Sequence, residues 1–142
     1  MIATASRYLV CLLAAGCAAA AAPAVTPDPD DPHRPTVSRR QADLIARVQV
    51  VGETNAAAAV SLLRDERRDD TPAPALDFVL GNLYVRLDRL DNAGDAFTRA
   101  LETFPAFHDA RLNLGRVRLM QERYRAAADA FRPLAVTAGG AE

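Results

Sequence analysis

Apolar residues recur at helical spacing from residue 38 onward, and this periodicity predicts pairs of amphipathic helices. The first apolar stripe consists of Leu44, Ile45, Val48 and Val51. Ser38 stands just before this helix, where an N-cap residue belongs. We expect Gly52 to end the helix, because glycine commonly follows the last helical turn.

A second apolar run predicts the partner helix of this pair. It extends from Ala56 to about Arg68. Thr54 or Asn55 can cap its beginning. Residues 69–74 then hold two prolines, which break the helical pattern. The two helices are therefore expected to form an antiparallel hairpin around a tight glycine turn.

Residues 1–37 have the pattern of an export signal followed by a spacer. In residues 1–22, Arg7 precedes a short apolar run and then small residues, which is the order of a bacterial secretory signal peptide. The apolar run is shorter than the roughly 20 residues of a membrane span. Residues 23–37 hold five prolines and three aspartates, so we expect an extended, solvated and flexible linker without a cation site. His33 is interpreted as an ordinary linker residue.

The end of the apolar run resembles the lipobox of bacterial lipoproteins. It reads Leu13, Ala14, Ala15, Gly16 and Cys17. The resemblance implies cleavage before Cys17 and lipidation of this residue, which would tether the protein to the outer membrane, facing the periplasm. Ordinary signal-peptidase cleavage within residues 18–22 is the alternative and would give a soluble periplasmic protein. An uncleaved membrane anchor is the third possibility.

A motif that follows residue 74 occurs a second time further along the chain, with the same internal spacing. Its first copy contains Leu80, Gly81, Tyr84, Ala93, Phe97, Ala100 and Pro105. Its second copy contains Leu114, Gly115, Ala127 and Phe131. This pattern resembles the tetratricopeptide repeat, in which these residue types recur with a period of about 34 residues. Asp77 and Arg111 stand where that repeat has its first tryptophan.

The resemblance implies an all-α, tetratricopeptide-like solenoid in residues 38–142, with about three antiparallel hairpins and six helices. The hairpins are expected at residues 40–73, 74–107 and 108–141, of which the first is degenerate and the third partial. The motif glycines and alanines are expected where the two helices of a pair touch. The tyrosine and the phenylalanines are expected to fill the space between pairs, and Pro105 is expected to end its helix.

The same resemblance implies a protein or peptide partner on a concave face built from the first helix of each pair. Helical spacing from the leucine–glycine pair places eight residues there: Phe78, Asn82, Val85, Arg86, Leu112, Asn113, Arg116 and Met120. Asn82 and Asn113 resemble the groove asparagines that bond a ligand backbone in some members of the family. Arg86 and Arg116 can replace the lysines with which other members hold a carboxylate. The alternative is that these four are ordinary surface residues.

Composition and charge exclude several kinds of chemistry. The chain has 142 residues and a net charge of −1, and all 17 of its basic residues are arginine. The lack of lysine excludes a P-loop lysine or a Schiff base, and the near-neutral charge disfavours nucleic-acid binding. Both cysteines lie in the first 17 residues, so the body of the chain has no disulfide framework or cysteine zinc site. No catalytic residue, cofactor or metal is predicted. His108 is interpreted as a capping or packing residue and residues 64–70 as a solvated, salt-bridged helix end.

Together these observations favour a non-catalytic interaction adaptor that is tethered to the bacterial cell envelope, in a secretion, pilus or envelope-assembly complex. The alternative is an accessory subunit, or an N-terminal docking region, of a larger envelope enzyme or export system. The last hairpin is not followed by a polar capping helix, so its outer face is expected to dock a partner, another copy or a continuation of the chain.

Overall fold

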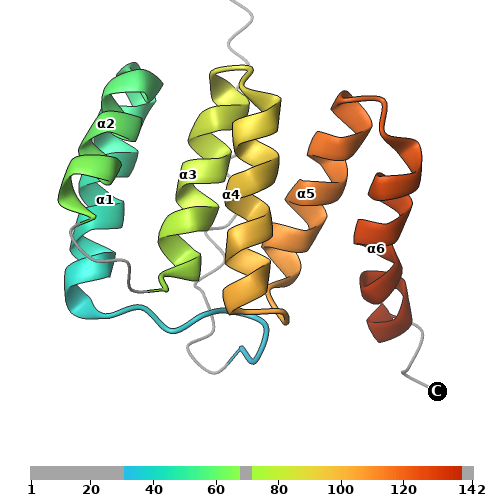
Figure 1. Cartoon of the computed structure of the whole chain (residues 1–142). Coiled ribbons are helices and arrows are strands. Elements are labelled where there is room, and N and C mark those ends of the chain that lie inside the picture. The colour runs from blue at the N-terminus through green and yellow to red at the C-terminus, as the bar shows by residue number, and fades with distance from the viewer. Residues whose placement is uncertain (1–30, 68–71, 139–142) are drawn as a thin grey trace, which may run out of the picture. The chain divides into compact units, whose positions relative to one another are not determined.

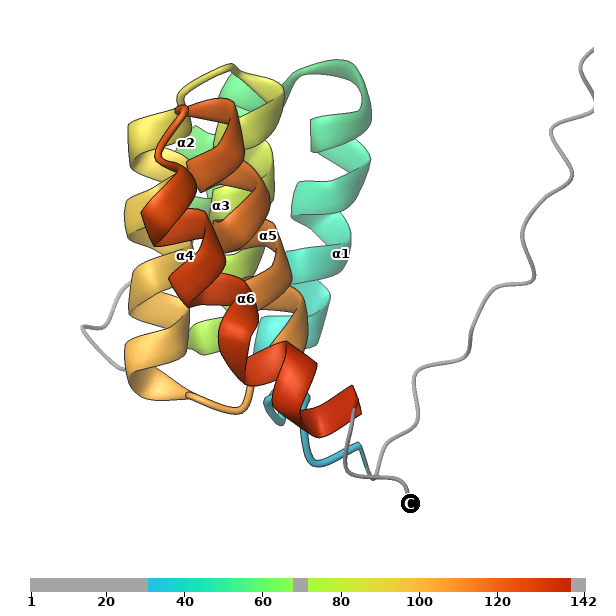
Figure 2. The same ribbon diagram turned by 90° about the vertical axis from the view of Figure 1, so that its right-hand side faces the viewer.

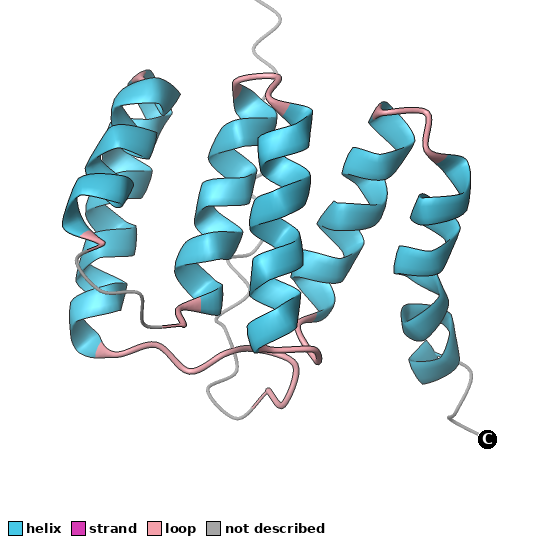
Figure 3. Cartoon of the chain, viewed as in Figure 1, coloured by secondary structure: helices cyan, strands magenta, loops and turns pink. Residues whose placement is uncertain are grey.

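The computed structural model describes residues 31–67 and 72–138, and the regular structure within them is entirely helical (Figure 1). Six helices follow one another: α1 (Arg39–Thr54), α2 (Ala56–Glu66), α3 (Pro74–Arg86), α4 (Leu90–Thr103), α5 (His108–Met120) and α6 (Tyr124–Ala138). The loops within the described ranges are short (Figure 3), and the helices pair as the hairpins α1–α2, α3–α4 and α5–α6. The expected all-α solenoid of three hairpins is confirmed.

Neighbouring hairpins pack against each other in chain order. α2 contacts α3 and α4 contacts α5, while α1 also reaches α3. The view along the array has α4 at the left and α1 at the right, with α3 and α5 between them (Figure 2). α3 therefore packs against both helices of the preceding hairpin and against its own partner α4, and the following hairpin packs mainly on α4.

Both helices of the first hairpin begin at a polar cap, as predicted. The hydroxyl of Ser38 accepts a hydrogen bond from the backbone N–H of Gln41 (3.2 Å), and the Gln41 side chain accepts one from the N–H of Ser38 (2.9 Å). This reciprocal pair is a capping box. The side chain of Asn55 accepts a hydrogen bond from the N–H of Ala58 (3.0 Å) and caps α2. Asn55 is also the residue on which the chain turns from α1 to α2.

The prediction that Gly52 ends the first helix is wrong. α1 continues to Thr54, and Gly52 is buried inside it. A Cβ at this position would lie 3.3 Å from Cδ2 of Leu83 and 3.5 Å from a guanidinium nitrogen of Arg86, both on α3. The glycine therefore serves the close approach of α1 to α3 rather than a turn.

An exposed ion pair takes part in joining the helices of the first hairpin. Arg47 donates hydrogen bonds to both carboxylate oxygens of Glu66, at 2.7 and 2.5 Å. The hydrogen bond with Glu66 raises the pKa of the Arg47 guanidinium. Arg47 occupies the position that Gly81 has one repeat later. The first hairpin thus has a long arginine side chain where the repeat motif has glycine. Its helices are joined by an ion pair at this position, and its sequence departs from the motif there.

In the other two hairpins a glycine receives the ring of a phenylalanine. A Cβ on Gly81 would lie 2.5, 2.7 and 2.8 Å from three ring atoms of Phe97. A Cβ on Gly115 would overlap the ring of Phe131 in the same way. Each ring therefore rests on the backbone of the first helix of its own hairpin, inside the hairpin rather than between hairpins as expected.

The other motif positions surround this contact. Five of them are buried: Leu80, Tyr84, Ala93, Ala100 and Ala127. Leu114 is half-buried and packs against the same core. α4 ends at Thr103, and Pro105 lies in the turn that follows.

The turn inside each of these hairpins repeats with the sequence. Asp88 and Glu122 occupy the same position in successive repeats and have left-handed φ angles of 56° and 60°. The backbone N–H groups of Arg89 and Arg123 then bond to the carbonyl five residues earlier, at 2.9 and 2.8 Å. This is the hydrogen-bond pattern of a Schellman helix end. The period therefore extends from the helices to the backbone of the loop.

The described end of the linker packs on α5 and is not fully solvated. The half-buried ring of His33 stacks on His108, with ring centroids 3.6 Å apart and planes inclined by 14°. A guanidinium nitrogen of Arg34 lies 3.6 Å from a carboxylate oxygen of Asp109. The interpretation of His33 as an ordinary linker residue is wrong, because a residue distant in sequence provides a stacking partner.

Residues 1–30, 68–71 and 139–142 lie outside the described residues. The expected signal peptide, the lipidation site Cys17, the first part of the linker and the end of the last hairpin fall in these ranges. Among the residues that are described, no helix has both the length and the apolar character needed to cross a membrane.

Filling the space above Gly81 is expected to destabilise the domain. We expect Gly81→Ala to lower the free energy of unfolding by about 1–3 kcal/mol, the usual cost of overpacking a core. Urea unfolding followed by circular dichroism measures this change. Gly94→Ala is the matched control, because its Cβ would meet the flexible guanidinium of Arg118 at 3.3 Å. The control is expected to be neutral or to gain about 0.5–1 kcal/mol of helix propensity.

A smaller side chain at position 97 tests whether the contact with the Phe97 ring causes the loss of stability in Gly81→Ala. Phe97→Leu is expected to cost less in the Gly81→Ala background than in the unaltered protein, since it removes the clash together with the packing. Equal costs in both backgrounds would mean that the ring does not restrict this position.

Candidate partner-binding site

Two asparagines join α3 to α5 on the face where the partner was expected. The amide nitrogen Nδ2 of Asn113 donates a hydrogen bond to Oδ1 of Asn82 at 2.9 Å, and both side chains are half-buried. Asn82 keeps its own amide N–H groups for another partner. Oδ1 of Asn113 accepts a long hydrogen bond from Arg116, at 3.4 Å. The pair therefore presents an amide donor and a carbonyl acceptor side by side.

The two arginines of this face are exposed. Arg86 has no ion pair with any described residue, and one of its nitrogens lies near Gly52 of α1. Arg116 contacts Asn113 and has no carboxylate partner in the described parts of the chain. Both guanidinium groups are therefore available to an anionic group of a ligand. We define the first-helix face by Asn82, Arg86, Asn113 and Arg116.

The apolar residues around this face differ in exposure. Met120 is 54% exposed, whereas Val85 and Leu112 are half-buried. The ring of Phe78 packs against Phe107, with centroids 4.9 Å apart, and against Phe97 at 5.8 Å. Phe78 therefore belongs mainly to an aromatic cluster where α3, α4 and the start of α5 meet.

The structure also contains a buried ion pair that sequence reasoning missed. Asp77, in the first turn of α3, is only 2% exposed. Its carboxylate accepts two hydrogen bonds from Arg67, at 2.7 and 3.3 Å, and one from Nε of Arg99 at 3.3 Å. The prediction of a solvated helix end is wrong for Arg67, whose side chain is 26% exposed. The sequence does hold a signal for this ion pair. Asp77 stands where the repeat motif has a large buried residue, and a buried carboxylate needs hydrogen-bonding partners.

The comparison with protein-family models agrees with the repeated helical hairpins of this structure. A family model described as tetratricopeptide repeat matches residues 51–106 and 78–141, which together cover more than half of the chain. The chain belongs to the tetratricopeptide repeat family. Its repeats form a protein–protein interaction module. No curated protein matches the chain.

His108 is a packing residue of the tetratricopeptide domain, as predicted. It is the first residue of α5, and its ring lies against His33. Nδ1 of His33 is buried without a hydrogen-bond partner, so the two histidines interact by stacking and not through this nitrogen. Within residues 31–67 and 72–138, no three side chains of His, Cys, Asp or Glu cluster as metal ligands. The histidines therefore hold the end of the linker against the repeat.

The two sides of the buried ion pair are expected to differ in their effect on stability. Arg67→Ala leaves the carboxylate of Asp77 buried with one hydrogen bond, so we expect a loss of about 3 kcal/mol. Asp77→Leu leaves Arg67 and Arg99, whose side chains are 26% and 47% exposed, free to turn to solvent. We expect that variant to lose at most about 1 kcal/mol. Urea unfolding of the single and double variants measures both effects.

The double variant Arg67→Ala/Asp77→Leu tests whether the unpaired buried carboxylate of Asp77 causes the loss of stability in Arg67→Ala. Because it leaves no carboxylate buried, it is expected to be more stable than Arg67→Ala alone. Arg99→Ala removes one hydrogen bond of 3.3 Å and is expected to have a smaller effect than Arg67→Ala. Equal and additive losses from Arg67→Ala and Asp77→Leu would contradict a coupled buried pair.

Proposed function

We propose that this tetratricopeptide protein is a non-catalytic adaptor of the bacterial cell envelope. It binds an extended segment of a partner protein on the first-helix face. A lipid on Cys17 holds it at the outer membrane, facing the periplasm, where it serves a secretion, pilus or envelope-assembly complex. The hydrogen bond between Asn82 and Asn113 is the observation on which the binding mode rests.

The asparagine pair suits a peptide backbone. An extended peptide carries a carbonyl acceptor and an N–H donor at each residue. The free N–H groups of Asn82 can donate to the carbonyl, and Oδ1 of Asn113 can accept from the N–H. Because the bond between the asparagines fixes both amides, little side-chain entropy is lost when a ligand binds. Such contacts favour an extended chain without selecting its side chains.

The flanking residues add selectivity. Arg86 and Arg116 follow the asparagines by four and three residues, so they lie one helical turn further along α3 and α5. A guanidinium can hold a carboxylate through two parallel hydrogen bonds. Met120 offers an exposed, adaptable apolar contact on α5. These groups favour a partner segment that combines acidic and apolar side chains.

The envelope location is supported by the first part of the sequence. Residues 1–22 have the order of a secretory signal, and the lipobox-like segment ends at Cys17. Both cysteines lie in this segment, so the repeats carry no thiol that an oxidising periplasm would modify. The proline-rich residues 23–37 would give the domain reach from the membrane.

Mass spectrometry of the N-terminal peptide of the purified native protein tests the lipid anchor. We expect the mature chain to start at Cys17 and to carry the mass of a diacylglyceryl or triacyl group, with the protein in the membrane fraction. Cys17→Ser is the control and is expected to lose both the added mass and the membrane association. An unmodified N-terminus within residues 18–22 would instead establish soluble export.

Truncating one asparagine tests the binding face. We expect Asn113→Ala to weaken capture of partners from an envelope extract of the source cells about tenfold, as the loss of a hydrogen bond of about 1.4 kcal/mol predicts. The bait concentration that gives half-maximal capture is measured in a quantitative pull-down. The free energy of unfolding is expected to change by less than about 1 kcal/mol, because the side chain is only half-buried.

Glu102→Ala is the matched control, an exposed polar truncation on α4. It is expected to leave capture unchanged. If Asn113→Ala and the control capture the same proteins equally well, the partner does not bind the first-helix face.

A further inference from the structure

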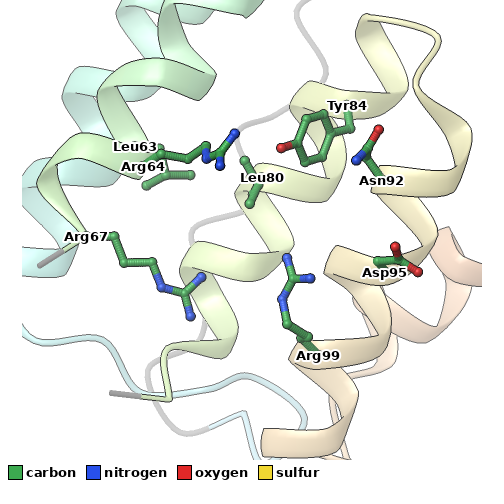
Figure 4. Close-up of a pocket in the computed structure, with 8 residues that line it drawn as sticks. All are labelled: Leu63, Arg64, Arg67, Leu80, Tyr84, Asn92, Asp95 and Arg99. Carbon is green, nitrogen blue, oxygen red and sulfur yellow. The ribbon is translucent and has the colours of Figure 1, made fainter. Parts of the chain in front are cut away.

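A pocket of about 460 Å³ opens where α2, α3 and α4 meet. It is lined by Leu63, Arg64, Arg67, Leu80, Tyr84, Asn92, Asp95 and Arg99 (Figure 4). We call it the arginine pocket. Its apolar floor is formed by the buried residues Leu63 and Leu80, and its walls are mainly polar.

The arginine pocket is separate from the first-helix face. Leu80 and Tyr84 each stand two residues from Asn82, which corresponds to about 200° of rotation around an α-helix. They therefore lie on the opposite side of α3 from the asparagine pair. A ligand in the pocket would leave the first-helix face free.

The buried carboxylate of Asp77 orients two of the three arginines. It binds Arg67 through both terminal nitrogens and Arg99 through Nε. The two terminal nitrogens of Arg99 are therefore left without a hydrogen-bond partner among the described residues. In Figure 4 the Arg99 side chain extends from α4 toward Leu80, whereas Arg67 extends from α2 toward α3. Asp77 is thus a positioning residue for Arg99, whose terminal nitrogens are the free donors.

Two further groups complete the set of donors. Arg64 has no ion pair with any residue of the described ranges, and its guanidinium points toward the pocket in Figure 4. The hydroxyl of Tyr84 points toward the same space and makes no hydrogen bond within the described residues. The pocket thus brings a phenol and three guanidinium groups together as donors, with the acceptors Asn92 and Asp95 also in its lining.

We propose that the arginine pocket binds a carboxylate, which a partner protein presents on an acidic side chain or at its C-terminus. The forked nitrogens of Arg99 and the free guanidinium of Arg64 hold the two carboxylate oxygens, and the Tyr84 hydroxyl donates a third hydrogen bond. The site is a second contact of this interaction module, on the other side of α3 from the first-helix face.

The charge balance favours a carboxylate over a phosphate. Three arginines face the pocket, and Asp77 and Asp95 offset two of their charges. One positive charge remains, which matches a carboxylate, whereas a phosphate monoester carries a charge of about −1.5 to −2 near pH 7. Asp95 at the edge of the pocket would also repel the additional negative charge.

Titration of the full chain with short peptides tests the assignment. The first probe is an acetylated and amidated tetrapeptide with one internal glutamate, and its partner has glutamine at that place. The Nε–Hε signals of the arginines are followed by NMR of the ¹⁵N-labelled protein. We expect the glutamate peptide to shift the signals of Arg64 and Arg99 in a saturable way, and the glutamine peptide to leave them unchanged. Equal binding of the two peptides would overturn the proposal.

Two further ligands identify the source of the anion. The glutamine peptide with a free C-terminus reports on a terminal carboxylate, and stronger binding of this peptide than of the glutamate peptide assigns the site to C-termini. Inorganic phosphate is the second ligand. If phosphate binds more tightly than either carboxylate, the site is not a carboxylate site.

Arg64 allows a variant that leaves the buried ion pair intact. Arg64→Ala is expected to weaken binding of the glutamate peptide at least about tenfold, and Arg64→Lys is expected to restore part of it, because lysine keeps the charge but not the fork. Arg125→Ala, an exposed arginine on α6, is the matched control and is expected to bind like the unaltered protein. Equal weakening by the control would mean that net charge rather than the pocket holds the peptide. Peptide binding here and partner capture on the first-helix face are separate measurements, so either proposal can fail without the other.

Discussion

The ring of Phe97 lies on the backbone of α3 at Gly81, and this contact sets the distance between the two helices of the central hairpin. Gly81 adds no side chain of its own to this contact, so α3 and α4 approach as closely as the ring of Phe97 allows. With α4 in this position, and with α1 and α2 packed against α3, Asn82 stays half-buried on one side of α3. On the other side, the buried residues Leu80 and Tyr84 line the arginine pocket. Both candidate binding surfaces therefore depend on the missing side chain of a single glycine.

Local signals in the sequence predicted the parts of the fold that depend on neighbouring residues. Ser38 and Asn55 cap the helices that follow them, and the period of the motif correctly gives the hairpins, since each motif contact lies within one hairpin. The wrong predictions concern residues whose environment is made by distant segments. Gly52 faces α3, and His33 stacks on His108, which lies two hairpins further along the chain. Helical spacing and composition carry no information on such contacts.

In the candidate site, too, the features that depend on one helix were predicted, and those that depend on contacts between hairpins were not. Helical spacing selected the residues of the first-helix face, because one periodic pattern determines which side chains share a helix surface. It did not give the bond between Asn82 and Asn113, nor the burial of Phe78 in an aromatic cluster, since both depend on how α3 meets the next hairpin. The sequence predicts a solvated side chain for Arg67, because its neighbours in residues 64–70 are all charged and no periodic pattern marks one of them as buried. Only the position of Asp77 distinguishes that arginine from its neighbours.

The two junctions between hairpins differ in chemistry although their backbones repeat. At the first junction Asp77 is buried beneath the arginine pocket, whereas Arg111, at the same position of the next repeat, donates a hydrogen bond to the carbonyl of Pro105. The residues that follow the three pocket arginines by one period are Thr98, Leu101 and Pro133. At the second junction the hairpins are joined by the asparagine pair and by Gln121, which accepts from Arg118 at 3.0 Å and donates to Asp91 at 2.8 Å. A packing repeat needs the same small and aromatic residues at each period, but a binding site needs one set of charges in one place. The departures from the motif are therefore where selectivity for a partner can reside, and one of them, Asp77 at the junction of α2, α3 and α4, supports the arginine pocket.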